Sequence, residues 1–284
     1  MRDCNPQRAT TEKGGFWHNL LEPALLLTLL VPGLGHLYTG RGRRALFWFL
    51  LVEGLFLAGW WILGVRFFGG GNSFGATPFG LGIPLLAIPE IGNFLATWLV
   101  HQTFPAVQDP TWVEAVNEAK MPVPFEEVGF FLTGAAGLVN LFAAADAWWF
   151  ARRGEVAKSS TLAPALAALL SWLVPGLGQW RLGHRTQALF QFGAITGLFV
   201  LGLAFSGFTA LDRAQVYFWY AGMIFNGGAT ALGTVLFAGV PLTTTGSIFW
   251  DLGVTVTCIA GLMNVVVIID AYTLAEKRAE EGGC

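Results

Sequence analysis

The charged residues divide the chain into long apolar windows separated by short polar stretches. None of Asp, Glu, Lys or Arg occurs in 23–40, 67–89, 128–145, 186–211, 214–250 or 252–269. These windows are apolar on all faces, and a helix needs about 20 such residues to cross a hydrocarbon core. Backbone groups in lipid are paired within a helix or a closed barrel, and the alternation that marks a barrel is missing. The pattern therefore predicts transmembrane helices.

Prolines, glycines and charges subdivide these windows, and the result is an all-α polytopic membrane protein of about eight transmembrane helices. We predict helices over 16–38, 45–65, 83–104, 128–152, 162 to beyond Pro175, 185–206, 214–239 and 248–274. The expected domains are a polar tail (1–15), a first four-helix repeat (16–153), a linker (154–161), a second four-helix repeat (162–274) and a charged tail (275–284).

The division into two repeats follows from an internal duplication. Leu30–Gly35 reads Leu-Val-Pro-Gly-Leu-Gly and recurs as Leu173–Gly178, at an offset of 143 residues. Further matches follow in the same order at offsets of 133 and 124. Four crossings in each unit would leave both copies the same way up, as parallel repeats related by an axis along the membrane normal.

Composition agrees with lipid as the main solvent, since 54% of the residues are hydrophobic and 12% are charged. The net charge of −2 argues against a nucleic-acid partner. The three cysteines and four histidines show no disulfide or metal-ligand spacing. We therefore expect the lipid bilayer and a membrane-protein partner, with no cofactor and no metal.

The two Pro-Gly-Leu-Gly segments are candidate helix breaks. Proline interrupts the helical hydrogen bonding, and glycine lets a neighbouring backbone approach closely. Paired breaks in two halves point to a transporter site, but they also suit a bend or tight turn needed for packing. The residues concerned are Pro32, Gly33, Gly35, Pro175, Gly176 and Gly178.

Acids and amides inside the predicted spans form a candidate polar site. Asp146 and Asp270 occupy matching positions, and intramembrane acids mark functional sites by default. Both precede a cationic helix end, so they also suit anchoring near the interface. Glu53 and Glu90 suit either a proton relay or neutral hydrogen bonding. Asn140 and Asn264 suit hydrogen bonding between helices.

A Gly-x-Ser-x-Gly match at 71–75 raises an intramembrane hydrolase as a third possibility. Ser73 would act there with His36 or His101. The motif carries this meaning only on a strand-to-helix elbow, whereas here it lies in a glycine-rich loop. We therefore expect that the protein is not an enzyme.

The orientation is predicted from the distribution of Lys and Arg. With eight crossings, ten cations share the side of the termini, against six on the other side. This excess predicts cytoplasmic termini in a bacterial inner membrane. The six are Arg41, Arg43, Arg44, Lys120, Arg181 and Arg185. If the first predicted helix is instead a re-entrant hairpin, the cluster at 41–44 returns to the side of the termini and the count changes.

The segment Pro32–Arg41 resembles the short two-helix transmembrane domain with the pattern G-x-x-G-x-H-x-x-Y-x-G-[KR]. It is also similar to bacterial membrane-protein families of unknown function with a P-G-L-G-[HQ] motif. The second copy departs from the pattern, with Gln179 and Arg181 at the positions of His36 and Tyr38. The resemblance implies a polytopic membrane protein, and it favours a cytoplasmic motif turn. No reaction comes with it.

Three functions follow as hypotheses. The first is a structural or assembly protein that binds a partner through helix faces or the 105–125 loop. The second is a small transporter or channel with the acids along a polar path. The third is the hydrolase. Acids that converge on one hydrated cavity would favour transport, whereas dispersed acids around a glycine-packed centre would favour the first hypothesis.

Overall fold

The computed structural model describes residues 23–63, 103, 125–159, 162–212, 216–237 and 249–282. Every element in these ranges is helical. Four of the helices are long and apolar enough to cross a membrane: α4 (Gly42–Leu63), α10 (Glu126–Ser159), α13 (Arg185–Phe205) and α16 (Trp250–Gly282). The described residues therefore confirm an all-α structure with four candidate membrane spans, while the predicted helix 83–104 lies almost wholly outside them.

The segment expected to form the first crossing is a hairpin in its described part. α2 (Pro23–Leu30) and α3 (Leu34–Tyr38) are joined by a turn in which Gly33 has a φ of 81°. Glycine enters this left-handed region at no steric cost. A Cβ on Gly35 would collide with the Ala24 carbonyl oxygen, so the two helices pack side by side. The Pro-Gly turn reverses the chain, so α2 and α3 do not form the single crossing expected over 16–38.

The same hairpin occurs at the second copy of the motif. α11 (Pro164–Leu173) and α12 (Leu177–Arg181) are joined at Gly176, which has a φ of 83°. A Cβ on Gly178 would collide with the Ala167 carbonyl oxygen. Each of these contacts lies 143 residues after its counterpart in the first hairpin. The two glycines of each motif are therefore required by the turn and by close packing.

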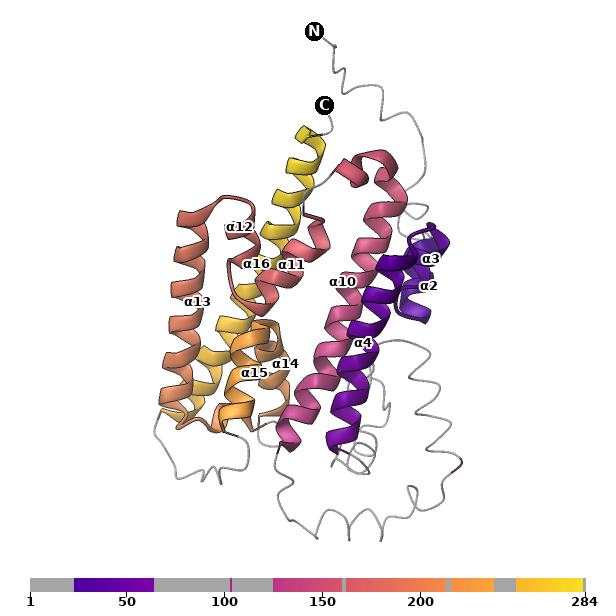
Figure 1. The fold of residues 1–284 in the computed structure, drawn as a ribbon. Coiled ribbons are helices and arrows are strands. Elements are labelled where there is room, and N and C mark those ends of the chain that lie inside the picture. Colours follow the sequence, from indigo (N-terminus) through magenta and orange to yellow (C-terminus); the bar gives the residue numbers. More distant parts are fainter. Residues whose placement is uncertain are drawn as a thin grey trace.

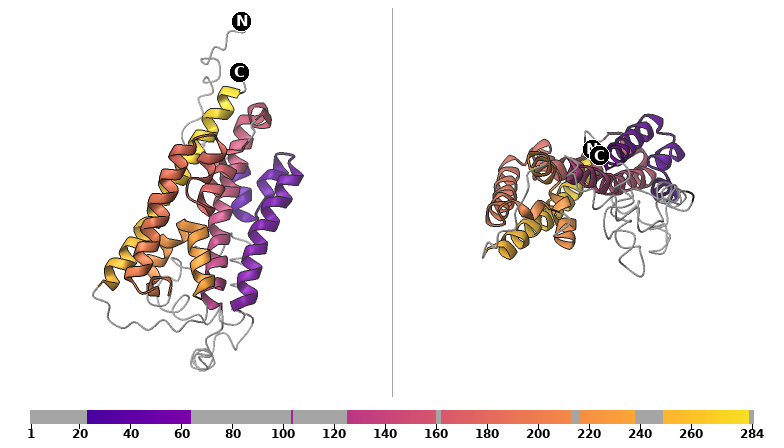
Figure 2. Two further views of the ribbon diagram at one scale, coloured as in Figure 1. Left: turned by 60° about the vertical axis from the view of Figure 1, so that its left-hand side comes forward. Right: turned by 90° about the horizontal axis from the view of Figure 1, so that it is seen from below.

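The long helices pack in pairs through glycine. Gly59 of α4 lies against Gly129 of α10, and Gly202 of α13 lies against Gly253 of α16. Because glycine has no side chain, the two backbones of each pair approach closely. Seen end-on in Figure 2, α2, α3 and α4 lie on one side of α10, and α11 to α16 lie on the other.

A third hairpin stands where a full crossing was expected, at 214–239. α14 (Tyr217–Met223) and α15 (Gly227–Leu236) flank a short 3₁₀ turn, η3 (Ile224–Asn226). The turn meets the end of α11, because Trp172 Nε1 donates to the Ile224 carbonyl oxygen at 2.9 Å. Further along α15, Gly233 packs against Leu211, beyond the far end of α13. α15 therefore returns to the side from which α14 came.

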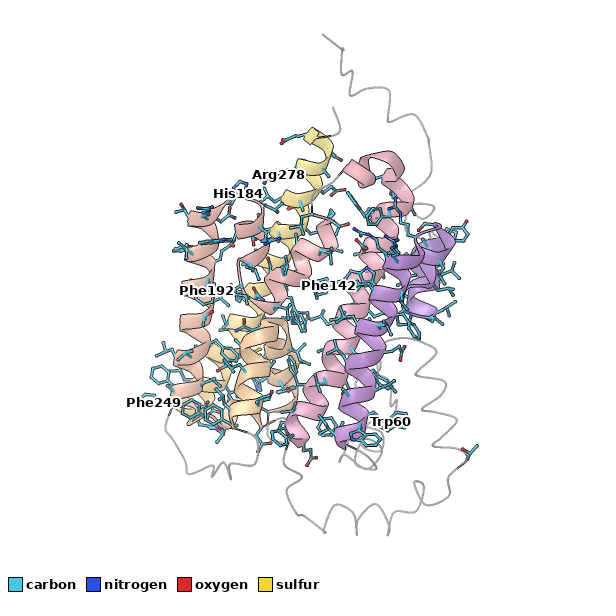
Figure 3. All side chains as sticks on the ribbon, viewed as in Figure 1. Trp60, Phe142, His184, Phe192, Phe249 and Arg278 are labelled. Carbon is cyan, nitrogen blue, oxygen red and sulfur yellow. The ribbon has the colours of Figure 1, made fainter. Side chains whose placement is uncertain are left out.

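The two ends of the bundle differ in charge. The C-terminal end of α16 lies at the same end as the α3–α4 and α12–α13 turns, the upper end in Figure 1. Figure 3 places His184 and Arg278 at this end, and Trp60 and Phe249 at the other. The expected separation of Arg41–Arg44 from the C-terminus is therefore wrong, since the hairpins return the chain to its own side.

Candidate functional site

The most elaborate polar cluster surrounds Asp146 in α10, whose side chain is fully buried. Its Oδ2 atom accepts hydrogen bonds from His36 Nε2 at 3.0 Å and Trp48 Nε1 at 2.9 Å. Arg44 NH1 lies 3.0 Å from Oδ1 and 2.8 Å from Oδ2. Because a carboxylate only accepts, the proton on the His36 ring stands on Nε2. Both oxygens of the acid are therefore engaged.

Local structure brings these donors together from three helices. His36 follows the Gly33 turn in α3, and the tight contact of Gly35 with α2 fixes its position. Arg44 and Trp48 are four residues apart in α4, so their side chains share one face of that helix. That face packs on α10 at Asp146. The turn, the glycine and the helical spacing thus build the site jointly.

Two arginines also contact the ring of Phe150, one turn after Asp146. The guanidinium carbons of Arg41 and Arg44 lie 3.9 and 4.0 Å from its centroid. Burial and the neighbouring Arg44 lower the pKa of Arg41, while Asp146 acts in the opposite direction. Asp146 therefore contributes one negative charge to a site that contains two positively charged arginines.

The matching acid, Asp270 in α16, has a related but uncharged set of donors. Gln179 Nε2 donates to its Oδ2 atom at 3.0 Å, and Gln187 Nε2 does so at 2.8 Å. Gln179 and Gln187 lie 143 residues after His36 and Arg44. Asp270 is half-buried, whereas Asp146 is fully buried. The second copy therefore keeps the hydrogen bonds to the acid without the compensating cation.

Asn264 joins the tips of two hairpins. Its Nδ2 atom donates to the Ser171 carbonyl oxygen at 3.2 Å and to the Phe225 carbonyl oxygen at 2.8 Å. These carbonyls belong to the end of α11 and to η3, where helical hydrogen bonding stops. Asn264 therefore connects α16 with the ends of two shorter elements.

The remaining candidate residues are placed only in part by the structure. Asn140 is fully buried in α10, and Glu53 is half-buried in α4. Glu90, Ser73 and His101 lie outside the described residues. Asp146 and Asp270 stand in separate clusters, each held by its own hairpin. Within the described ranges, no group of three or more His, Cys, Asp or Glu side chains is placed to hold a metal ion.

Sequence reasoning missed the donors to both acids. The signal was available, since His36 and Gln179 share one position in the repeat and both carry a side-chain N–H. Arg44 and Gln187 share another. A search for identical residues does not find such pairs, because the residues differ between the two halves. What each pair shares is a side-chain N–H that donates to a carboxylate.

The chain was compared with known proteins. A family model described as "Family of unknown function (DUF6677)" matches residues 23–160 and 166–281. No curated protein and no solved structure matches the chain. The two matched segments end and begin near the linker predicted at 154–161.

Proposed function

We propose that this chain, which belongs to the DUF6677 family of unknown function, is a membrane-embedded structural or assembly protein that binds a partner membrane protein through its lipid-facing helices. It acts without a catalytic centre or a cofactor. The partner is a transmembrane helix that packs on the outer face of α13.

The observation that carries this proposal is a pair of outward-facing glycines. Gly193 and Gly197 are exposed on α13 at a spacing of four residues, and no atom of the described residues lies within 4 Å of a Cβ built on either. Elsewhere in this bundle, glycines such as Gly59 and Gly202 mark places where two helices touch. Small residues spaced in this way let membrane helices associate closely. An uncovered pair thus favours a helix from another chain.

Helix burial supports the same assignment. Only 28% of the apolar window of α4 and of α13 is buried within the protein, against 67% for α10 and 50% for α16. The inner pair holds the fold together, whereas α4 and α13 present most of their surface to the bilayer. Gly54 on α4 matches Gly197 at the offset of 143 and is likewise exposed, with open space around it.

The polar clusters support a structural role more than catalysis or transport. Asp146 is saturated by donors and neutralised by Arg44, so it stabilises the α3–α4–α10 contact. A transport acid must exchange its partners, whereas both oxygens of Asp146 are engaged by donors from the protein. Tight glycine contacts fill the interfaces between the long helices.

We further infer that the two halves are parallel copies of one unit. The support is the shared turn geometry of Gly33 and Gly176, and the matching donors to Asp146 and Asp270. With hairpins in place of some expected crossings, the described residues of each unit include two long spans. This even number keeps both copies the same way up, as parallel repeats require.

The charge asymmetry supports cytoplasmic termini in a bacterial inner membrane. Arginines and lysines at described positions gather at the end with the α3–α4 and α12–α13 turns, whereas the charged residues described at the opposite end are acidic. Positive loops face the cytoplasm. The acidic set is Glu126, Glu127, Asp212 and Asp251.

A photo-crosslinking experiment tests the partner helix. A photoreactive residue at Phe190, which is exposed on α13, should give one discrete protein adduct in cells. Gly193→Leu with Gly197→Leu should abolish that adduct while the purified protein keeps its thermal stability. Gly54→Leu on α4 is the matched control and should keep it. Adducts with lipid alone, or an adduct that survives the double substitution, would contradict the proposal.

A second candidate function, transport of a small polar solute, has one observation in its favour. Asn226 is fully buried at the tip of the α14–α15 hairpin, and neither polar atom of its amide has a hydrogen-bond partner. A group that needs both a donor and an acceptor suits water or a small hydroxylated solute. Solute or water flux into vesicles that falls on Asn226→Leu, with the fold intact, would favour transport.

A further inference from the structure

An excess of positive charge stands at the start of α4. Arg41, Arg43 and Arg44 lie within four residues, and Asp146 is the carboxylate that Arg44 pairs with. Among the described residues, no carboxylate forms an ion pair with Arg41 or Arg43. Two cations at this end of the bundle therefore have no carboxylate as an ion-pair partner in the part of the chain that the structure describes.

The position of Arg41 makes this excess costly. Its guanidinium lies over the Phe150 ring and is half-buried. The guanidinium carbons of Arg41 and Arg44 lie 3.9 and 4.0 Å from the centroid of this one ring, so the two positive charges are close together. Burial and this like charge both disfavour the cationic form of Arg41. A bound anion would relieve both effects.

The backbone adds donors at the same place. The first turn of α4 holds no acidic residue, and the first N–H groups of a helix have no acceptor within it. The positive end of the helix dipole lies there as well. A phosphate group is suited to this combination, because arginine forks and helix N-termini both donate to its oxygens.

We propose that Arg41 and Arg43, together with the first turn of α4, bind the phosphate of an anionic phospholipid headgroup. The next turns of α4 expose Leu46, Phe47 and Leu50, so an apolar surface for acyl chains continues directly from the arginines. Free phosphate would use the cations but not this surface. Basic pockets beside membrane helices on the cytoplasmic side bind such headgroups.

The second half supplies an internal comparison. The residues 143 positions after Arg41, Arg43 and Arg44 are His184, Thr186 and Gln187. The matching turn before α13 thus has the same backbone arrangement, but its two arginines, Arg181 and Arg185, stand at other positions than the three arginines of the first half. The lipid site belongs to the first half, and the equivalent turn in the second half does not bind an anionic headgroup specifically.

Lipid titration of the purified full chain tests the site. Native mass spectrometry in detergent would count bound lipids as phosphatidylglycerol or phosphatidylcholine is added. We expect saturable binding of phosphatidylglycerol and none of phosphatidylcholine. Arg41→Gln with Arg43→Gln should weaken this binding by roughly 20- to 30-fold, since each arginine near an anionic surface contributes about 1 kcal/mol.

The control removes the same charge from the other half. Arg181→Gln with Arg185→Gln should change phosphatidylglycerol binding less than about twofold if the first half holds the site. Equal weakening by both double variants would show diffuse attraction and overturn the proposal. Displacement of the lipid by millimolar inorganic phosphate would overturn the choice of a lipid. The assay needs no partner protein, so its failure leaves the proposed partner helix untouched.

Discussion

Replacing Asp146 by alanine should destabilise the protein far more than the same change at Asp270. Asp146 is fully buried and accepts from His36, Arg44 and Trp48. Its loss leaves a partly buried guanidinium and two buried N–H donors without an acceptor. Breaking a buried ion pair by removing one partner costs about 3–5 kcal/mol. We expect Asp146→Ala to lower the unfolding free energy by that amount.

The cost at Asp270 should be smaller for two physical reasons. Its donors, Gln179 and Gln187, are neutral amides, and Gln187 is exposed enough to hydrogen-bond elsewhere. A neutral hydrogen bond contributes about 0.5–1.5 kcal/mol net, and those within membranes average about 0.6 kcal/mol. We expect Asp270→Ala to cost about 1 kcal/mol.

Unfolding in mixed micelles with increasing SDS measures both variants, with tryptophan fluorescence as the signal because Trp48 belongs to the cluster. A double-mutant cycle with Arg44→Ala isolates the ion pair. The coupling should approach the loss seen in Asp146→Ala alone, because either change leaves the other charge uncompensated. Similar losses for the two aspartates, or a coupling near zero, would refute the assignment of Asp146 as the buried anchor of the first hairpin.

Further substitutions test the packing and the orientation. Gly178→Ala should destabilise the protein by about 1–3 kcal/mol, since the new methyl group meets a carbonyl oxygen. Gly193→Ala should stabilise the monomer by up to about 1 kcal/mol, because alanine favours a helix more than glycine does. Thermal unfolding compares the two variants. Asn264→Leu should cost about 1–3 kcal/mol because two carbonyl oxygens lose their donor, as measured in the same assay. A cysteine at Arg43 should react with an impermeant maleimide only from the cytoplasmic face, and one at Asp251 only from the opposite face.

The hydrophobic pattern was sufficient to predict helices and a membrane, because these depend on local composition. It also located both ends of α4 and α13 and the start of α10 and α16 to within a few residues, whereas α10 and α16 continue to Ser159 and Gly282, about two turns beyond the predicted ends. It was not sufficient to tell a crossing from a hairpin. Both bury apolar residues over a similar length, and only the geometry at Gly33 and Gly176 separates them.

The hydrophobic pattern could not predict the hydrogen-bond donors to the acids, for a different reason. Asp146 was identified as a candidate from its place in an apolar window, but its donors lie about 100 residues earlier in the chain. Only the folding of α3 and α4 against α10 brings them together. Arg44 precedes the apolar part of its helix, so it was counted with a loop. The hairpin, once known, places it beside the acid.

The difference between the two acid clusters suggests how the duplicated unit diverged. An acid that takes N–H donors from the motif hairpin and from the next helix is common to both halves, and this arrangement ties each hairpin to the last long helix of its unit. In the first half, the donors are His36 and Arg44, so this contact contains an ion pair and the acid is fully buried. In the second half, Gln179 and Gln187 make the contact neutral and partly exposed. The hydrogen-bonded contact between the hairpin and the acid is therefore the structural element that the two units share. The arginine in this contact is specific to the first half, where it adds to the cationic surface beside α4.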